Sequence, residues 1–247
     1  MKFSNIPKFV VNLSHRTENM TLISEEMKYI GWDFERFEAI NKNSYMGCTL
    51  SHLEIIKLAK DRGYSRVMVV EDDCIFMPYA KSFLEKLENQ IQEIEFSIFN
   101  FTPTLNRKVN ISEKYSLLLD ITKLPPKENQ NNTEIFATNM MIYDQSIYDI
   151  MFDISTTGFT SGDYYFPIDG YLANFIYPKF QSYCPVVPIA PQRRSYSDVS
   201  HGVYNNYYTQ VYNWNVYSPV KIDGSYNNQE VTEKIKQTQN HIEYNVS

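Results

Sequence analysis

The first third of the chain alternates short apolar runs with segments in which apolar residues recur every three or four positions. Residues 8–13 (KFVVNL) form a short apolar run, which is typical of a buried parallel strand. The next segment has a helical period and is followed by Gly31, which predicts an amphipathic helix with a glycine C-cap. Its apolar positions are Met20, Ile23, Met27 and Ile30.

A second strand and a second helix are expected next. The strand is assigned to residues 32–37. Ser51 and Glu54 have the spacing of a capping box, which predicts a helix that begins at Ser51 and ends near Gly63. The residues of the accompanying hydrophobic staple are Leu50 and Ile55.

A third pair of elements completes the alternation. Residues 66–70 (RVMVV) are almost continuously apolar and predict a central strand that is covered on both faces. The helix expected after them buries Phe83 or Leu84, Leu87, Ile91 and Ile94. Strands that alternate with helices are joined by right-handed crossovers and form a largely parallel sheet.

The second half of the chain is less regular. We expect a strand over 97–101, an exposed polar loop over 123–133, and a strand over 135–143 that leads into a helix with Ile147, Ile150 and Met151 inward. The sequence therefore predicts one α/β domain over residues 1–215, with a mostly parallel central sheet, helices on both faces and an irregular C-terminal half. Residues 216–247 are expected to form a polar extension, partly helical over 230–240.

Composition narrows the choice of partners and compartment. The net charge of −6 argues against a nucleic-acid duplex as a partner, because duplex binding normally needs a basic face. The three cysteines are widely spaced, so neither a disulfide framework nor a zinc site is expected. The N-terminal apolar stretch is too short for a signal peptide or a membrane span, which predicts a cytoplasmic protein. A homodimer stays open.

Three consecutive carboxylates, Glu71, Asp72 and Asp73, directly follow the predicted central strand. Open α/β sheets bind ligands outside the carboxyl ends of their strands. In extended backbone Glu71 and Asp73 project to one side and Asp72 to the other. A divalent cation would relieve their mutual repulsion and would bind phosphate oxygens. The alternative is a solvated acidic loop, or caps for the helix after Pro78.

Several blocks make the chain resemble the family 25 glycosyltransferases, the group that holds bacterial lipooligosaccharide galactosyltransferases and collagen hydroxylysine galactosyltransferases. The blocks are Val11-Asn12-Leu13 with Arg16, Gly47-Cys48 with Ser51-His52, Glu71-Asp72-Asp73, Pro167-Ile168-Asp169, and Pro188 through Gln192 to Ser197-Asp198. They span residues 8–200, with divergence over 100–133. The second and third blocks, about 20 residues apart, are the most specific.

The resemblance implies a GT-A (Rossmann-like) fold, a UDP-sugar donor, a divalent metal (usually Mn²⁺, otherwise Mg²⁺) and inversion at the anomeric carbon. The expected reaction moves galactose or glucose to a hydroxyl of a glycan or of a collagen-like hydroxylysine. Two other readings stay open. One is a non-catalytic glycosyltransferase-like module that binds glycan or scaffolds a partner. The other is a nucleotidyltransferase, which the absence of a Gly-rich phosphate loop disfavours.

The donor is expected to contact residues from four blocks. Asn12 and Arg16 follow the first strand, where base and ribose lie in this fold, although Arg16 also suits a surface helix start. Ser51 is expected as a cap, and His52 as a phosphate donor at a helix N-terminus. The other candidates are Glu71, Asp72 and Gln192, with Arg193 and Arg194 as diphosphate contacts or as a basic surface pair.

The metal and the catalytic base complete the predicted site. Glu71 and Asp73, together with His201, are the expected metal ligands, although a lone surface histidine is the commoner reading. An inverting transfer needs a base for the acceptor hydroxyl. The family pattern favours Asp169, with Asp163 in reserve, and both also suit turns or caps.

Overall fold

A computed structural model describes residues 2–42, 45–92, 94–122, 135–153, 167–193, 195–197, 202–204 and 210. Its central sheet has the strand order β2-β1-β3-β8-β4-β9-β6, and all strands except β8 and β6 run in the same direction. The strands are β1 (Lys8–Asn12), β2 (Glu35–Glu38), β3 (Arg66–Glu71), β4 (Ile98–Asn100), β6 (Leu118–Asp120), β8 (Met140–Asp144) and β9 (Ser182–Pro185). The predicted α/β fold with a mostly parallel sheet is confirmed.

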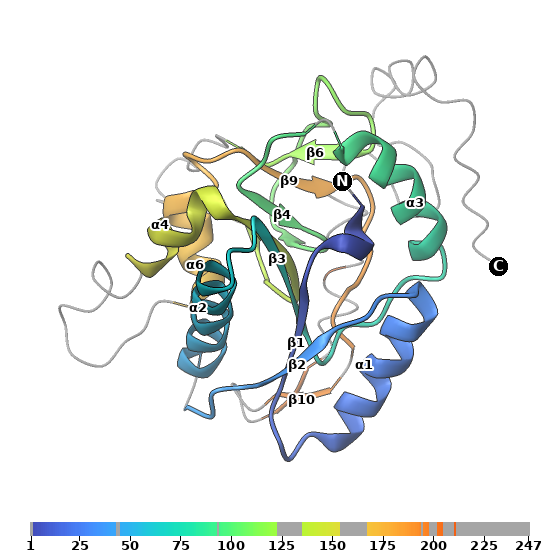
Figure 1. Cartoon of the computed structure of the whole chain (residues 1–247). Coiled ribbons are helices and arrows are strands. Elements are labelled where there is room, and N and C mark those ends of the chain that lie inside the picture. Colours follow the sequence, from blue (N-terminus) through green and yellow to red (C-terminus); the bar gives the residue numbers. More distant parts are fainter. Residues whose placement is uncertain are drawn as a thin grey trace.

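Helices cover both faces of this sheet, as expected. In Figure 1, α1 (Thr17–Ile30) and α3 (Ala80–Ile91) lie on one side, and α2 (Met46–Asp61), α4 (Tyr148–Phe152) and α6 (Ile168–Tyr171) lie on the other. The short elements are η1 (Phe3–Asn5), η2 (Gln145–Ile147) and η3 (Leu172–Ile176), with the small strand pairs β5 (Thr104–Leu105) with β7 (Ile135–Phe136) and β10 (Ser195–Ser197) with β11 (Gly202–Tyr204).

Strand β3 is the centre of the core, because it pairs with β1 in parallel and with β8 in antiparallel. Residues 67–70 are fully buried, as a central strand requires. Val11 pairs with Glu71, and Val70 pairs with Met140. The carboxyl ends of β1 and β3 and the start of β8 therefore meet at one edge of the sheet.

Helix α1 follows its prediction closely. Ile23, Met27 and Ile30 are buried, and Gly31 ends the helix at φ 82° with its N–H donating to Met27 and Lys28. A left-handed C-cap is the conformation that glycine adopts without steric cost.

Helix α2 begins at Met46, so the predicted start at Ser51 is wrong. Ser51 lies inside the helix, where its hydroxyl donates to the Gly47 carbonyl (2.7 Å) and accepts from the Ile40 N–H (2.9 Å). The Ile40 carbonyl packs closely against Gly47. Any larger residue would place a Cβ 2.5 Å from that carbonyl oxygen, so the contact requires glycine. The capping-box spacing is also the spacing of neighbours on a helix face, and this ambiguity caused the error.

Several other boundaries differ from the predictions. The second strand covers Glu35–Glu38 rather than 32–37, because Trp32 turns into the core. The strand expected over 135–143 divides into β7 and β8 around Ala137, which has φ 68°. Ile147 and Met151 are buried as expected, whereas Ile150 is only partly covered. The loop over 123–133 and the extension over 216–247 lie outside the described residues.

Among the described helices, none combines the length and the hydropathy needed to cross a bilayer.

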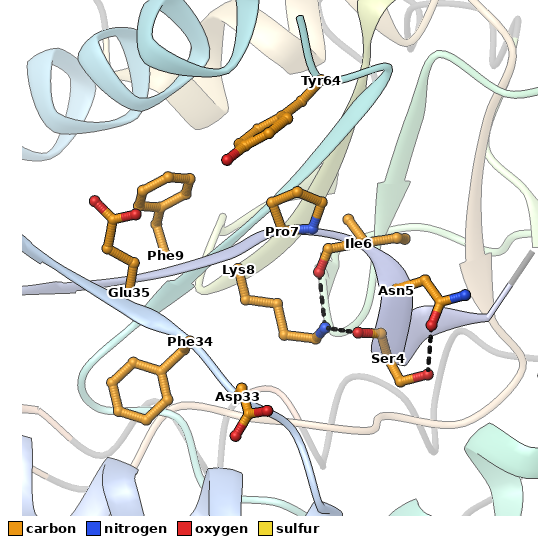
Figure 2. Close-up of a pocket in the computed structure, with 10 residues that line it drawn as sticks. All are labelled: Ser4, Asn5, Ile6, Pro7, Lys8, Phe9, Asp33, Phe34, Glu35 and Tyr64. Atoms are coloured by element: carbon orange, nitrogen blue, oxygen red, sulfur yellow. Dashed lines mark hydrogen bonds between the residues drawn. The ribbon is translucent and has the colours of Figure 1, made fainter. Parts of the chain in front are cut away.

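A surface pocket lies at the opposite edge of the sheet, at the amino ends of β1 and β2 (Figure 2). Lys8 lines this pocket but is only 4% exposed, and its ammonium donates to the carbonyls of Ser4 (3.1 Å) and Ile6 (2.8 Å). Burial lowers its pKa to about 8, although the charges of Asp33 and Glu88 oppose the shift.

This lowered pKa predicts a pH-dependent stability. Between pH 7 and pH 10 the unfolded chain holds the Lys8 proton more tightly than the folded chain, so the free energy of unfolding rises with pH. Relative to a Lys8→Met variant, we expect a gain of about 2–3 kcal/mol over this range. Urea unfolding at each pH measures it, and the exposed Lys57→Met variant is the control. A constant difference between wild type and Lys8→Met would contradict the prediction.

Candidate active site at the carboxyl edge of the sheet

The predicted acidic cluster lies at the edge where β1, β3 and β8 meet. The Glu71 N–H donates to the Asn139 carbonyl (2.8 Å), which joins the end of β3 to the loop before β8. Helix α2 and the first turn of α6 also reach this edge, since Cys48 contacts Glu71 and the Ala137 N–H donates to Asp169. The site is therefore assembled from segments far apart in the sequence.

Asp72 is almost fully buried and bound by three side chains. Asn12 donates to Oδ2 (2.7 Å), Asn19 donates to Oδ1 (3.2 Å), and the Arg16 guanidinium lies 3.1 Å from Oδ1. Burial raises the pKa of Asp72, and these three partners oppose the shift. Asp72 thus ties β3 to the end of β1 and to the start of α1. It holds Asn12 and Arg16, the predicted nucleotide contacts, in place.

Asn12 also links the site to the edge strand β2. Its Oδ1 accepts from Arg36 Nε (3.0 Å), and Arg36 forms an ion pair with Glu38 (2.7 Å). Neither Arg36 nor Asn19 was predicted as a site residue. Asn19 lies three residues after Arg16, one turn along α1, and this spacing was the available signal.

Glu71 points away from Asp72, toward α2. Its Oε1 accepts from the Thr138 hydroxyl (3.1 Å) and from the Cys48 thiol (3.8 Å), and His52 Nε2 lies 3.7 Å away. Cys48 and His52 are one turn apart on α2. The expectation that Ser51 and His52 open a helix is wrong, and both are fully buried. His52 faces Glu71, while Ser51 holds the loop before α2.

Asp73 has the least satisfied carboxylate of the three. Its Oδ2 lies 3.5 Å from the Gln192 amide nitrogen, whereas its buried Oδ1 has no hydrogen-bond partner among the described residues. Burial raises the pKa of Asp73 well above its usual range, and the charges of Glu71 and Asp72 add to the shift. An unpaired carboxylate oxygen beside two other acidic groups is suited to a hard divalent cation. Asp73 and Glu71 therefore fit the Mn²⁺ or Mg²⁺ that the resemblance implies.

Asp169 approaches the same place from the first turn of α6. Its carboxylate accepts from the N–H groups of Gly170 (2.7 Å) and Ala137 (3.4 Å). Burial raises its pKa, while these two donors lower it. Burial also raises the pKa of the Cys48 thiol, followed by the charges of Glu71, Asp169 and Asp73. The candidate base thus lies close enough to the acidic cluster to share its electrostatic field.

The sequence did not predict a role for the loop before β8, although this loop contacts both Glu71 and Asp169. Ala137 has φ 68°, a strained value for a residue with a Cβ, and its N–H donates to Asp169. Thr138 binds Glu71, and the Asn139 amide is held by Ala190 and Gln210. Strain of this kind clusters at functional sites.

The other predicted residues fall into two groups. Gln192 lies beside Asp73, and Arg193 is paired with Glu26 (3.0 Å), so its guanidinium holds α1. Asp163, His201 and Arg194 lie outside the described residues, and their predicted roles stay predictions.

One comparison matches the central part of the chain to a protein family. The family model described as glycosyltransferase family 25 (LPS biosynthesis protein) matches residues 42–158. This confirms the resemblance to glycosyltransferase family 25. The family 25 match contains the Gly47-Cys48, Ser51-His52 and Glu71–Asp73 blocks, and it supports a glycosyltransferase. Asn12, Arg16 and Asp169 lie outside the matched range.

Solved structures that resemble this one have low sequence identity to this chain. A glycosyltransferase involved in glycosylation of the major capsid of PBCV-1 is 10% identical (TM-score 0.47) and covers 79% of this chain and 96% of its own. A197 from STIV is 8% identical (TM-score 0.38; 80% and 92%). The inositol-1-phosphate CTP transferase from T. maritima is 15% identical (TM-score 0.39; 72% and 65%). No curated protein sequence matches the chain.

Proposed function

We propose that the protein is an inverting glycosyltransferase that moves galactose or glucose from a UDP-sugar to a hydroxyl acceptor with the help of a divalent cation. The family 25 match supports the class of reaction. The observation that carries the finer proposal concerns Asp73 at the carboxyl edge of the sheet. One of its buried carboxylate oxygens lies near Glu71 and has no partner in the part of the chain that the structure describes. The acceptor class is a glycan or a collagen-like hydroxylysine.

The residues divide into three roles. Asp73 and Glu71 would hold Mn²⁺ or Mg²⁺, with His201 as the predicted third ligand, and the cation would stabilise charge on the departing diphosphate. Asn12 and Arg16 would bind the nucleoside, because Asp72 fixes both at the end of β1. Gln192 would contact the diphosphate from the side of Asp73.

Asp169 is the proposed base, with Asp163 as the reserve. As the glycosidic bond forms, its carboxylate would take the proton of the acceptor hydroxyl. Burial raises the pKa of Asp169, which brings it nearer to the pH at which a general base works well. The N–H groups of Gly170 and Ala137 hold the carboxylate in one orientation.

A panel of UDP-sugars, tested with Mn²⁺, with Mg²⁺ and with a chelator, tests this proposal. We expect UDP release from UDP-galactose or UDP-glucose that depends on the cation and persists slowly without acceptor. CDP- and GDP-sugars serve as matched controls for the nucleoside. If the protein neither binds UDP with Mn²⁺ nor releases UDP from any donor, the proposal is wrong. The protein would then be a non-catalytic glycosyltransferase-like module.

A further inference from the structure

His52 has a buried imidazole nitrogen that the proposed transfer reaction does not use. The ring is fully buried, and Nδ1 lies 2.9 Å from the Tyr143 hydroxyl. Nε2 has no hydrogen-bond partner among the described residues, and its neighbour is Glu71 Oε1 at 3.7 Å. This distance is too long for a hydrogen bond. A buried polar atom without a partner is costly and calls for an explanation.

Either tautomer of His52 leaves Nε2 unsatisfied. If the Tyr143 hydroxyl donates to Nδ1, the proton on Nε2 faces a carboxylate that is out of range. If Nδ1 donates to Tyr143, the lone pair of Nε2 faces the negative charge of Glu71. A cation between the two groups would satisfy the second arrangement. It is also the arrangement in which metal-binding histidines are usually held by an outer partner.

The Cys48 thiol completes a set of three ligand atoms. Cys48 Sγ, His52 Nε2 and a Glu71 carboxylate oxygen all lie within 4.8 Å of one another. Sγ and Oε1 are 3.8 Å apart, and Nε2 and Oε1 are 3.7 Å apart. Tetrahedral zinc bonds of 2.0–2.3 Å separate such ligand pairs by about 3.6 Å and about 3.4 Å, respectively. Two of the three separations are therefore within a few tenths of an ångström of those in a bound state.

From this geometry we propose that Cys48, His52 and Glu71 form a Zn²⁺ site, which shares Glu71 with the hard-cation position at Asp73. A thiolate and an imidazole select a softer ion than Mn²⁺ or Mg²⁺. Two ligands come from one face of α2 at a spacing of four residues, and the third comes from the end of β3. On binding, the ion replaces the thiol proton of Cys48, which leaves to solvent. Tyr143 is a positioning residue for His52.

Two of the three proposed ligands are partly exposed to solvent. The Glu71 side chain is 21% exposed and Cys48 is partly exposed, whereas His52 is fully buried. Three protein ligands leave the fourth tetrahedral position for water or another group. Because Glu71 also belongs to the proposed Mn²⁺ position, bound Zn²⁺ would compete for this carboxylate. Zinc binding by these three residues does not depend on the transfer reaction.

Cobalt titration of the reduced full-length protein tests the site without any activity assay. Co²⁺ reports a tetrahedral thiolate site by sulfur-to-metal charge-transfer absorption. We expect one equivalent to produce this band, and Zn²⁺ to remove it by displacement. Cys48→Ser should abolish the band, and His52→Gln should weaken Co²⁺ binding at least tenfold. Tyr143→Phe should weaken binding about tenfold or more, as outer partners of metal-bound histidines do. Cys184→Ala, which removes a buried thiol in β9, should leave the titration unchanged.

Alkylation of the wild-type protein tests the zinc site without any substitution, so the result does not depend on whether a variant folds. Zn²⁺ at one equivalent should protect Cys48 from iodoacetamide, as read by peptide mass spectrometry, and Mn²⁺ should not. Absence of the cobalt band in the wild type, its persistence in folded Cys48→Ser, or unchanged alkylation of Cys48 with Zn²⁺ would each overturn the proposal.

Discussion

An Asp73→Asn variant is expected to lose transferase activity by a factor of about 10²–10³ or more while keeping its fold. Asparagine preserves the shape of the side chain but cannot supply the negative charge that a divalent cation needs. The folded protein also gains from the exchange, because burial and two neighbouring carboxylates disfavour the charged form of Asp73. Initial rates of UDP release with Mn²⁺, together with thermal unfolding without metal, measure both effects.

The matched control for this variant is Asp61→Asn, at the exposed end of α2. It removes the same charge far from the site and should leave the rate unchanged. Wild-type turnover in Asp73→Asn would show that Asp73 does not hold the cation. If the metal-free Asp73→Asn variant were much less stable than the wild type, the negative charge of Asp73 would not lower the folding stability, contrary to expectation.

An Asp72→Ala variant is expected to lose about 3–5 kcal/mol of folding stability, because it removes one partner of a buried charge network. Asn12 and Arg16 would both lose the acceptor that fixes them. Asn12 and Asp72 are buried, and the Arg16 side chain is 19% exposed. Chemical denaturation measures the change. UDP binding should weaken as well, since the proposed nucleoside contacts would no longer be held.

Asp149→Ala is the control for this second variant. It breaks the ion pair between Asp149 and Lys60, where the Asp149 side chain is 77% exposed. Exposed pairs contribute about 1 kcal/mol or less, so little change is expected. Equal stabilities of the Asp72→Ala and Asp149→Ala proteins would refute a structural role for Asp72.

Periodicity predicted the elements that bury a continuous face. Strands β1 and β3 and helix α1 were found because their apolar residues follow the period of their own secondary structure. The start of α2 was missed because the Ser51–Glu54 spacing suits both a capping box and two neighbours on a helix face. The close contact of Gly47 with Ile40, which fits the helix start at Met46, lies outside any local pattern. Local patterns do not report such a tertiary contact.

The sequence also predicted only some of the residues of the candidate site. Alternation along an extended chain placed Asp72 opposite Glu71, as their separate partners in the structure show. The loop at Ala137–Asn139 could not be found, because only the antiparallel return of β8 beside β3 brings it to Glu71. Cys48 and His52 carried a usable signal, a spacing of four residues on one helix, although the widely spaced cysteines argued against zinc.

The position of the bound cation decides whether Asp73 belongs to a donor site. Crystals grown with UDP and Mn²⁺ would show the ion by its anomalous scattering. We expect a peak in direct contact with the Asp73 carboxylate, with the nucleoside at Asn12 and Arg16. A nucleotide bound at the opposite edge of the sheet, in the pocket beside Lys8, with no ion at Asp73, would contradict it.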